Sequence, residues 1–212
     1  MYLSRVEIDT HNRQKMKSLS HLGAYHNWVE QSFPQEINQG QRLRHLWRID
    51  FLGDKEYLLL LSNDKPDLNQ LAKYGVTGTA GTKSYDHFLQ QLAVGMVMQF
   101  RLTANPSYRD KESGRIYPHV TVAQQKQWLA ERAERCGFQF VTNRDGEPYF
   151  DLTSREWPLL YHGKRKIKLS RASFEGALKI TDLDKFKKAL TEGIGREKAY
   201  GMGLLTVIPE RR

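Results

Sequence analysis

Three groups of residues in this sequence have types and spacings that could carry chemistry: seven histidines, one basic run and one glycine-rich segment. His21 and His26 stand five residues apart, about 140° around a helix, so they point in different directions. No HExxH motif and no i, i+3 or i, i+4 histidine pair is present, so we expect no metal site. His26 and His45 fall on apolar faces and are expected to be structural. His21 lies off the apolar stripe, where a half-exposed imidazole is either a general acid or base or an ordinary surface histidine.

The basic run lies between His162 and Arg171 and contains no acidic residue. Its cationic side chains are Lys164, Arg165, Lys166, Lys168 and Arg171. A charge run is most often a solvated face, but the whole chain also carries a net charge of +9, and Gly163 predicts a protruding hairpin. Such a hairpin can reach the phosphates of an A-form RNA helix. We therefore favour a nucleic-acid interface over a simple solvated loop.

The glycine-rich segment runs from Gly193 to Gly203 and also contains Gly195 and Gly201. A dinucleotide fold needs a strand before such glycines and a helix after them, whereas here a helix is predicted to precede them. A P-loop needs Gly-Lys-Ser/Thr, which is absent. Two interpretations remain open: a turn that lets a helix and a strand pack closely, or a nest of N–H groups that binds a phosphate.

Other chemistry finds little support in the sequence. Cys136 is the only cysteine, which excludes a disulfide scaffold, a cysteine-based zinc site and an iron–sulfur cluster. No Gly-x-Ser-x-Gly motif is present, and no inward-facing carboxylate pair is evident. The first fifteen residues lack the apolar stretch of a signal peptide, and the longest apolar runs are too short to cross a bilayer. We expect an intracellular protein with no cofactor and no membrane partner.

The elements that must position these residues form two similar runs along the chain. The first consists of a strand at 2–9, a helix at about 13–33, a hairpin of strands at 43–52 and 57–62, a short helix at 67–74 and a strand at 96–104. Its order is β-α-β-β-α-β, which is typical of a ferredoxin-like domain. A flexible stretch is expected around Gly75–Gly81, and a linker at 107–114.

The second run has elements that fit the same pattern. They are a helix at 122–136 ended by Gly137, strands at 138–143 and 149–152, the basic segment, a strand at 172–180, a short helix capped by Thr181 with Asp184, and a strand at 204–208. We therefore predict an α+β protein of two tandem ferredoxin-like (RRM-like) βαββαβ domains. Domain 1–106 contains the helix that bears His21, and domain 115–212 contains the basic hairpin and the glycine-rich loop.

A basic protein with one acid/base histidine and no metal site is suited to one reaction in particular. RNA supplies its own nucleophile, the 2′-OH. Its attack on the adjacent phosphorus needs no metal if a side chain moves protons and cations stabilise the charge. The products are a 2′,3′-cyclic phosphate, or its opened form, and a 5′-OH.

Several segments resemble one known family, the CRISPR RNA-processing endoribonuclease CasE, the repeat-cleaving subunit of the type I-E system. The resemblance covers nearly the whole chain. The segments are Tyr2–Val6, His21–His26 followed by Phe33-Pro34, Phe100–Pro106, Trp128-Leu129, Phe174–Ile180 and Gly193–Leu205. Each is moderate evidence alone, but their order and spacing together are strong.

The resemblance implies tandem ferredoxin-like domains and metal-independent cleavage of CRISPR repeat RNA at the base of a stem-loop. His21 matches the family's catalytic histidine and His26 its second histidine. The basic residues at 164–168 match the hairpin that grips the stem, and the glycine loop helps to shape the site. The implied partners are repeat stem-loop RNA and the other subunits of the Cascade surveillance complex, in a prokaryotic cytoplasm. The alternatives are a stem-loop-binding subunit that does not cut RNA, and a general nucleic-acid chaperone.

Overall fold

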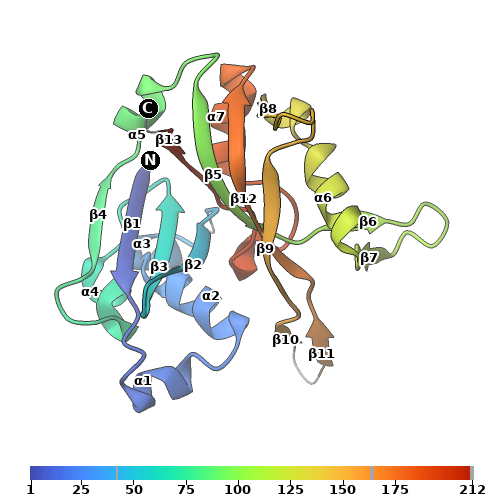
Figure 1. The fold of residues 1–212 in the computed structure, drawn as a ribbon. Coiled ribbons are helices and arrows are strands. Elements are labelled where there is room, and N and C mark those ends of the chain that lie inside the picture. The colour runs from blue at the N-terminus through green and yellow to red at the C-terminus, as the bar shows by residue number, and fades with distance from the viewer. Residues whose placement is uncertain (42, 163–164, 211–212) are drawn as a thin grey trace. The chain divides into compact units, whose positions relative to one another are not determined.

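The computed structural model describes residues 1–41, 43–162 and 165–210. The chain divides into two compact units that alternate along the sequence. Unit 1 comprises Met1–Gln90, Leu159–Ile167 and Lys198–Gly201, and unit 2 comprises Gln91–Pro158, Lys168–Glu197 and Met202–Arg212. Each unit contains an antiparallel sheet accompanied by helices (Figure 1), which is the expected α+β class. No helix among the described residues combines the length and the apolar character needed to cross a bilayer.

The sheet of unit 1 has the strand order β2-β3-β1-β4. Its strands are β1 (Tyr2–Glu7), β2 (Leu46–Leu52), β3 (Lys55–Ser62) and β4 (Gly81–Ser84). Helix α2 (Leu22–Gln31) follows β1, and helix α4 (Leu68–Leu71) with the 3-10 turn η1 (Ala72–Tyr74) follows β3. The ferredoxin-like pattern is therefore confirmed, but its closing strand is β4, where we expected only a flexible stretch.

The predicted hairpin of β2 and β3 forms as expected around Gly53, whose φ is 64°. Strand β3 also pairs with β1, which places Val6 opposite Leu58; both side chains are fully buried. Because side chains alternate between the two faces of a strand, the apolar residues at every second position form the core of this sheet.

The predicted single helix at 13–33 is wrong in detail, because three shorter helices replace it. They are α1 (Arg13–Ser18), α2 (Leu22–Gln31) and α3 (Pro34–Asn38). Helix α1 begins at the N-cap Asn12, whose side chain accepts hydrogen bonds from two backbone N–H groups, and it ends at Leu19. Helix α3 starts at Pro34, and a proline disfavours helical geometry in the residue before it. The chain therefore turns on either side of α2.

The sheet of unit 2 has the order β13-β5-β12-β8, with β9 also paired to β12. Its strands are β5 (Val97–Ala104), β8 (Phe138–Phe140), β9 (Phe150–Glu156), β12 (Arg171–Ile180) and β13 (Leu205–Pro209). The strand predicted at 96–104 thus forms as β5. It is the first strand, in chain order, of the sheet of unit 2, and not the last strand of the sheet of unit 1. Alternation showed which of its faces is buried, but not which strands it pairs with. The predicted limits 1–106 and 115–212 separate β5 from the sheet to which it belongs.

The remaining elements of unit 2 correct two further predictions. The segment expected to be a linker forms the hairpin of β6 (Ser107–Arg109) and β7 (Ile116–Pro118). The helix cap expected at Thr181 is instead Asp182, whose side chain accepts a hydrogen bond from the Lys185 N–H. The helices are α6 (Val122–Ala130), the 3-10 turn η2 (Glu134–Cys136) and α7 (Leu183–Glu192). Gly137 ends η2 with a φ of 76°, as expected of a C-terminal glycine. Helix α5 (Asp86–Gln91) lies at the boundary between the two units.

Candidate active site

His21 lies at the N-cap of α2 and not on the flank of a continuous helix. Its backbone is extended, with φ −157° and ψ 162°, and its side chain makes no capping hydrogen bond. The prediction that His21 lies on the flank of a continuous helix, off its apolar stripe, is therefore wrong in its local structure. His21 is half-buried, as expected, but it is positioned by the first turn of α2. An N-cap residue has non-helical backbone angles, so the direction of its side chain does not follow the periodicity of the helix.

Packing against two neighbours holds the ring of His21. The ring of Tyr161 meets it edge-on, with ring centroids 5.5 Å apart and an interplanar angle of 66°. Gly23 is also close to the ring, because a Cβ added there would lie 3.0 Å from Nδ1 of His21. Nδ1 is buried, and within the described chain it has no hydrogen-bond partner. Since no carboxylate holds this ring, His21 is available to take or give a proton.

The predicted basic hairpin forms and reaches His21 through Tyr161. Its strands are β10 (Leu159–His162) and β11 (Arg165–Lys168), which pair with each other. Lys166 is exposed, and its Nζ lies 5.7 Å from the centre of the Tyr161 ring. One aromatic ring therefore contacts both the predicted acid/base histidine and one predicted RNA-binding lysine.

The other predicted RNA-binding residues have different surroundings. Lys164 lies outside the described residues, and of Arg165 only the backbone, in β11, is described. Lys168 ends β11 and is exposed, whereas Arg171 begins β12 and is ion-paired with Glu156. The ion pair offsets part of the charge of Arg171, so Lys166 and Lys168 are the more available cations.

The glycine-rich loop has the close approach that its sequence predicted. Gly193, Gly195, Gly201 and Gly203 have φ values of 74°, 91°, 76° and 100°, a region that other residues rarely adopt. In unit 1, an added Cβ at Gly201 would lie 2.6 Å from Cζ3 of Trp47, whose Nε1 donates a hydrogen bond to the Ala199 carbonyl. These contacts support the packing interpretation.

His26 does not occupy the core position expected for it. The residues of α2 that face the interior are Leu22, Tyr25, Trp28 and Val29. The side chain of His26 is 35% exposed, and its Nδ1 lies 3.9 Å from Oε1 of Glu30. Its ring meets that of Tyr200 edge-on, 5.7 Å away, in the 3-10 turn η3 (Lys198–Tyr200). The prediction assigned His26 to the buried face by assuming one helix that continued through His21, whereas α2 begins only at Leu22.

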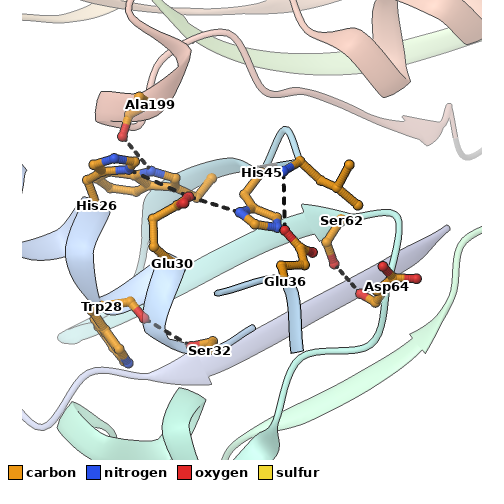
Figure 2. Close-up of polar contacts among 11 residues, drawn as sticks. His26, Trp28, Glu30, Ser32, Glu36, His45, Ser62, Asp64 and Ala199 are labelled. Carbon is orange, nitrogen blue, oxygen red and sulfur yellow. Dashed lines mark hydrogen bonds and ion pairs between the residues drawn. The ribbon is translucent and has the colours of Figure 1, made fainter. Parts of the chain in front are cut away.

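His45 is buried as predicted, but its partners were missed. Figure 2 shows its ring between two carboxylates, with Nδ1 2.9 Å from Oε1 of Glu30 and Nε2 3.2 Å from Oε1 of Glu36. The ring of Phe33 stacks on it at 3.9 Å. Burial lowers the pKa of His45, but the hydrogen bonds and charges of the two glutamates outweigh burial and raise that pKa above 6.5. Each ring nitrogen lies within hydrogen-bond distance of a different carboxylate, so the protonated form of the ring can donate to both. Two glutamates six residues apart gave no recognisable pattern in the sequence.

This geometry suits proton transfer next to a polyanion. His21 is available for acid/base chemistry, Tyr161 orders its ring, and Lys166 supplies a nearby positive charge. Among the described residues, no group of three or more histidine, cysteine, aspartate or glutamate side chains could hold a metal ion.

Comparisons with known proteins agree with this fold. The model of the family described as "CRISPR associated protein" matches residues 1–209. The chain is 26% identical to the CRISPR-associated endoribonuclease Cse3 of Thermus thermophilus, over 99% of this chain and 100% of that protein. It resembles the structure of Thermus thermophilus Cse3 bound to an RNA representing a pre-cleavage complex, with a TM-score of 0.81, 25% identity and 98% of each chain covered. The fold is also similar to that of Cas6e from Escherichia coli, with a TM-score of 0.67, 24% identity, and coverage of 99% of this chain and 100% of that one.

Proposed function

Because this chain belongs to the CRISPR associated protein family, we propose that it is a metal-independent endoribonuclease that cleaves CRISPR repeat stem-loops in precursor RNA. The full-length similarity to Cse3, which is named an endoribonuclease, supports this function. Its partners are then the repeat RNA, which it processes into mature guide RNA, and the other subunits of a Cascade surveillance complex in a prokaryotic cytoplasm.

One observation carries the proposal. His21, for which the described residues show no carboxylate partner, contacts the basic hairpin through Tyr161. The ring of His21 contacts the ring of Tyr161 in β10, and Nζ of Lys166 in β11 lies near that same tyrosine ring. A substrate phosphate held by the hairpin would therefore come close to an acid/base group. An imidazole whose Nδ1 is buried and whose ring contacts Tyr161 close to Gly23 keeps its orientation during proton transfer.

The reaction proceeds by attack of the 2′-oxygen on the adjacent phosphorus, with the 5′-oxygen of the next nucleotide as leaving group. The 2′-OH loses its proton as the new P–O bond forms, and the 5′-oxygen gains one as the old bond breaks. His21 moves one of these protons, and cations of the hairpin stabilise the negative charge on the phosphorane. The products are a 2′,3′-cyclic phosphate, or its opened form, and a 5′-OH.

The basic hairpin has the second role, which is to bind the stem. Lys164, Arg165, Lys166, Lys168 and Arg171 provide the positive charge for the phosphates of an A-form duplex. Gly195 lies close to the ring of Trp128, and Gly201 lies close to the ring of Trp47. The loop thereby shapes the site without contacting the reacting atoms.

The test uses end-labelled repeat stem-loop RNA in excess EDTA, with a second substrate that carries one 2′-deoxy residue just 5′ of the cut. We expect one cut in the all-RNA substrate and none in the deoxy substrate. His21→Ala should abolish cleavage and leave RNA affinity within about tenfold, because one neutral ring contributes little to phosphate binding. His26→Ala is the matched control, since it removes a half-exposed histidine of the same helix, and it should retain cleavage.

Two outcomes would overturn this assignment. An active His21→Ala variant would exclude His21 as the acid/base residue. A wild-type protein that binds both substrates and cuts neither would instead be a stem-loop-binding subunit without catalytic activity.

A further inference from the structure

The β6–β7 hairpin of unit 2 presents two exposed tyrosines to solvent, and the half-buried His119 follows directly after β7. Tyr108 and Tyr117 stand opposite each other in the two strands, with ring centroids 6.0 Å apart, and are 48% and 40% exposed. The ring of His119 lies 5.1 Å from that of Tyr108. We call Tyr108, Tyr117 and His119 the three-ring cluster. Large aromatic side chains left on a surface in this way are available for a partner.

Hydrogen bonds to buried groups hold this cluster in place. The His119 N–H donates to the Pro106 carbonyl at 2.9 Å. The carbonyl of His119 accepts a hydrogen bond of 2.8 Å from Nε2 of Gln125, a side chain of α6 that is 1% exposed. Figure 1 shows the hairpin beside α6. The rings thus project from a fixed base, which lowers the entropy lost when a flat group stacks on them.

Arginines lie around the same base. Arg155 of β9 donates a hydrogen bond to the carbonyl of Val120. Arg132, just after α6, lies with its guanidinium carbon 4.0 Å from the centre of the Trp128 ring. Burial lowers the pKa of His119, and the positive charge of Arg132 lowers that pKa further.

These cations lack the carboxylate partners that would neutralise them. Within the described chain, neither Arg132 nor Arg155 forms an ion pair, and the buried Nε of Arg132 has no acceptor. Burial, followed by the charges of Arg135 and Arg196, lowers the pKa of Arg132 to about 10, although Glu131 opposes this effect. A guanidinium whose charge is disfavoured first by burial and then by neighbouring cations gains from an incoming anion.

Rings for stacking beside uncompensated arginines are the two components of a surface for unpaired nucleotides. We propose that the three-ring cluster with Arg132 and Arg155 is a second RNA-binding surface, which stacks on the bases and contacts the phosphates of unpaired nucleotides that flank the stem-loop. Bases paired in a duplex do not expose their faces to such rings, so the surface selects single-stranded RNA. The identity of the RNA rests on the proposed function, whereas the chemistry of the surface does not.

The test measures affinity for three RNAs: the stem-loop alone, the stem-loop with unpaired tails on both sides, and a 12-nucleotide unpaired oligonucleotide. The variant is Tyr108→Ala/Tyr117→Ala, and Tyr149→Ala is the matched control because Tyr149 is a 61% exposed tyrosine elsewhere in unit 2. A second pair compares Arg155→Gln with Arg144→Gln, an exposed arginine in the turn before β9. Thermal melting confirms that each variant is folded.

We expect the tyrosine variant to bind the tailed RNA and the oligonucleotide about fivefold or more weakly, with stem-loop affinity within about twofold of wild type. Arg155→Gln should weaken the same two RNAs, and neither control should do so. Equal losses on all three RNAs, or no loss on any, would overturn the inference, as would a wild-type protein that binds the tailed RNA no tighter than the stem-loop. A wild-type protein that neither binds nor cuts the stem-loop refutes the proposed function instead. The inference is then tested by comparing the affinities of wild type and variants for the unpaired oligonucleotide alone.

Discussion

The buried network around His45 makes a quantitative prediction about stability. The His45 side chain is 2% exposed and bonds to Glu30 and Glu36, whose side chains are 27% and 7% exposed. Replacing it by leucine leaves a buried carboxylate without its cation, and removing one partner of a buried pair costs about 3–5 kcal/mol. Glu36 keeps the hydrogen bond from the Leu43 N–H to its Oε2, and Glu30 keeps its proximity to His26. We therefore expect the lower end of that range, about 3 kcal/mol, for His45→Leu.

Urea unfolding and thermal melting measure this loss. A change of about 3 kcal/mol in a chain of this size lowers Tm by roughly 6–12 °C. The double variant His45→Leu/Glu36→Leu provides the control, because it removes the carboxylate that the single variant leaves unpaired. Its destabilisation should be smaller than the sum of the two single changes, since neighbouring residues in one network are not additive.

The pH dependence of stability tests the same network independently. Because the pKa of His45 is raised in the folded protein above 6.5, its stabilising contribution is complete below the unfolded pKa and is lost as pH rises through the folded pKa. Wild-type stability should therefore fall as the pH rises above about 6.5, and this fall should be smaller in His45→Leu. A loss below about 1 kcal/mol in the variant, or an unchanged pH profile, would refute this account of the network.

Three other predictions follow from the glycines and the basic hairpin. Gly201→Ala should lower the free energy of unfolding by about 1–3 kcal/mol more than the control Gly78→Ala. Both positions have positive φ, but only a Cβ at Gly201 would lie 2.6 Å from a buried indole carbon. Equal melting curves for the two variants would contradict this. Gly23→Ala should reduce the cleavage rate about tenfold without weakening RNA binding, since the new Cβ would press on the His21 ring. Gly81→Ala, where nothing lies within 4 Å, is its control, and a wild-type rate in Gly23→Ala would argue against a catalytic ring there. Replacing the lysines and arginine at 164–166 by alanine should weaken stem-loop binding and reduce the slope of affinity against salt, because fewer counterions are released; an unchanged slope would exclude the hairpin from phosphate binding.

Local patterns were sufficient for much of the secondary structure. Alternating apolar residues predicted β1, β2 and β5, and the turn at Gly53 correctly predicted β3 as the hairpin partner of β2. These patterns are local because the period of a strand and the geometry of a turn depend on adjacent residues. The same patterns failed where a helix was interrupted, since nothing in its apolar spacing showed that α2 begins only at Leu22.

The residues of the candidate site were selected by the sequence, but their surroundings were not. Charge density singled out the basic hairpin, and motif order singled out His21. The contact of His21 with Tyr161 joins residues far apart in the chain, as does that of Trp47 with Gly201. No periodicity encodes such pairs, because they depend on which surfaces are buried together.

The sequence by itself determined the α+β class, strands β1, β2, β3 and β5, the family and the residue types available for proton transfer and phosphate binding. Only the tertiary structure decided that β5 belongs to the second sheet, that His45 lies between two glutamates and that His26 faces Tyr200. The reason is physical: element type follows from neighbours in the chain, whereas strand partners and the burial of charge follow from the free energy of packing the whole unit.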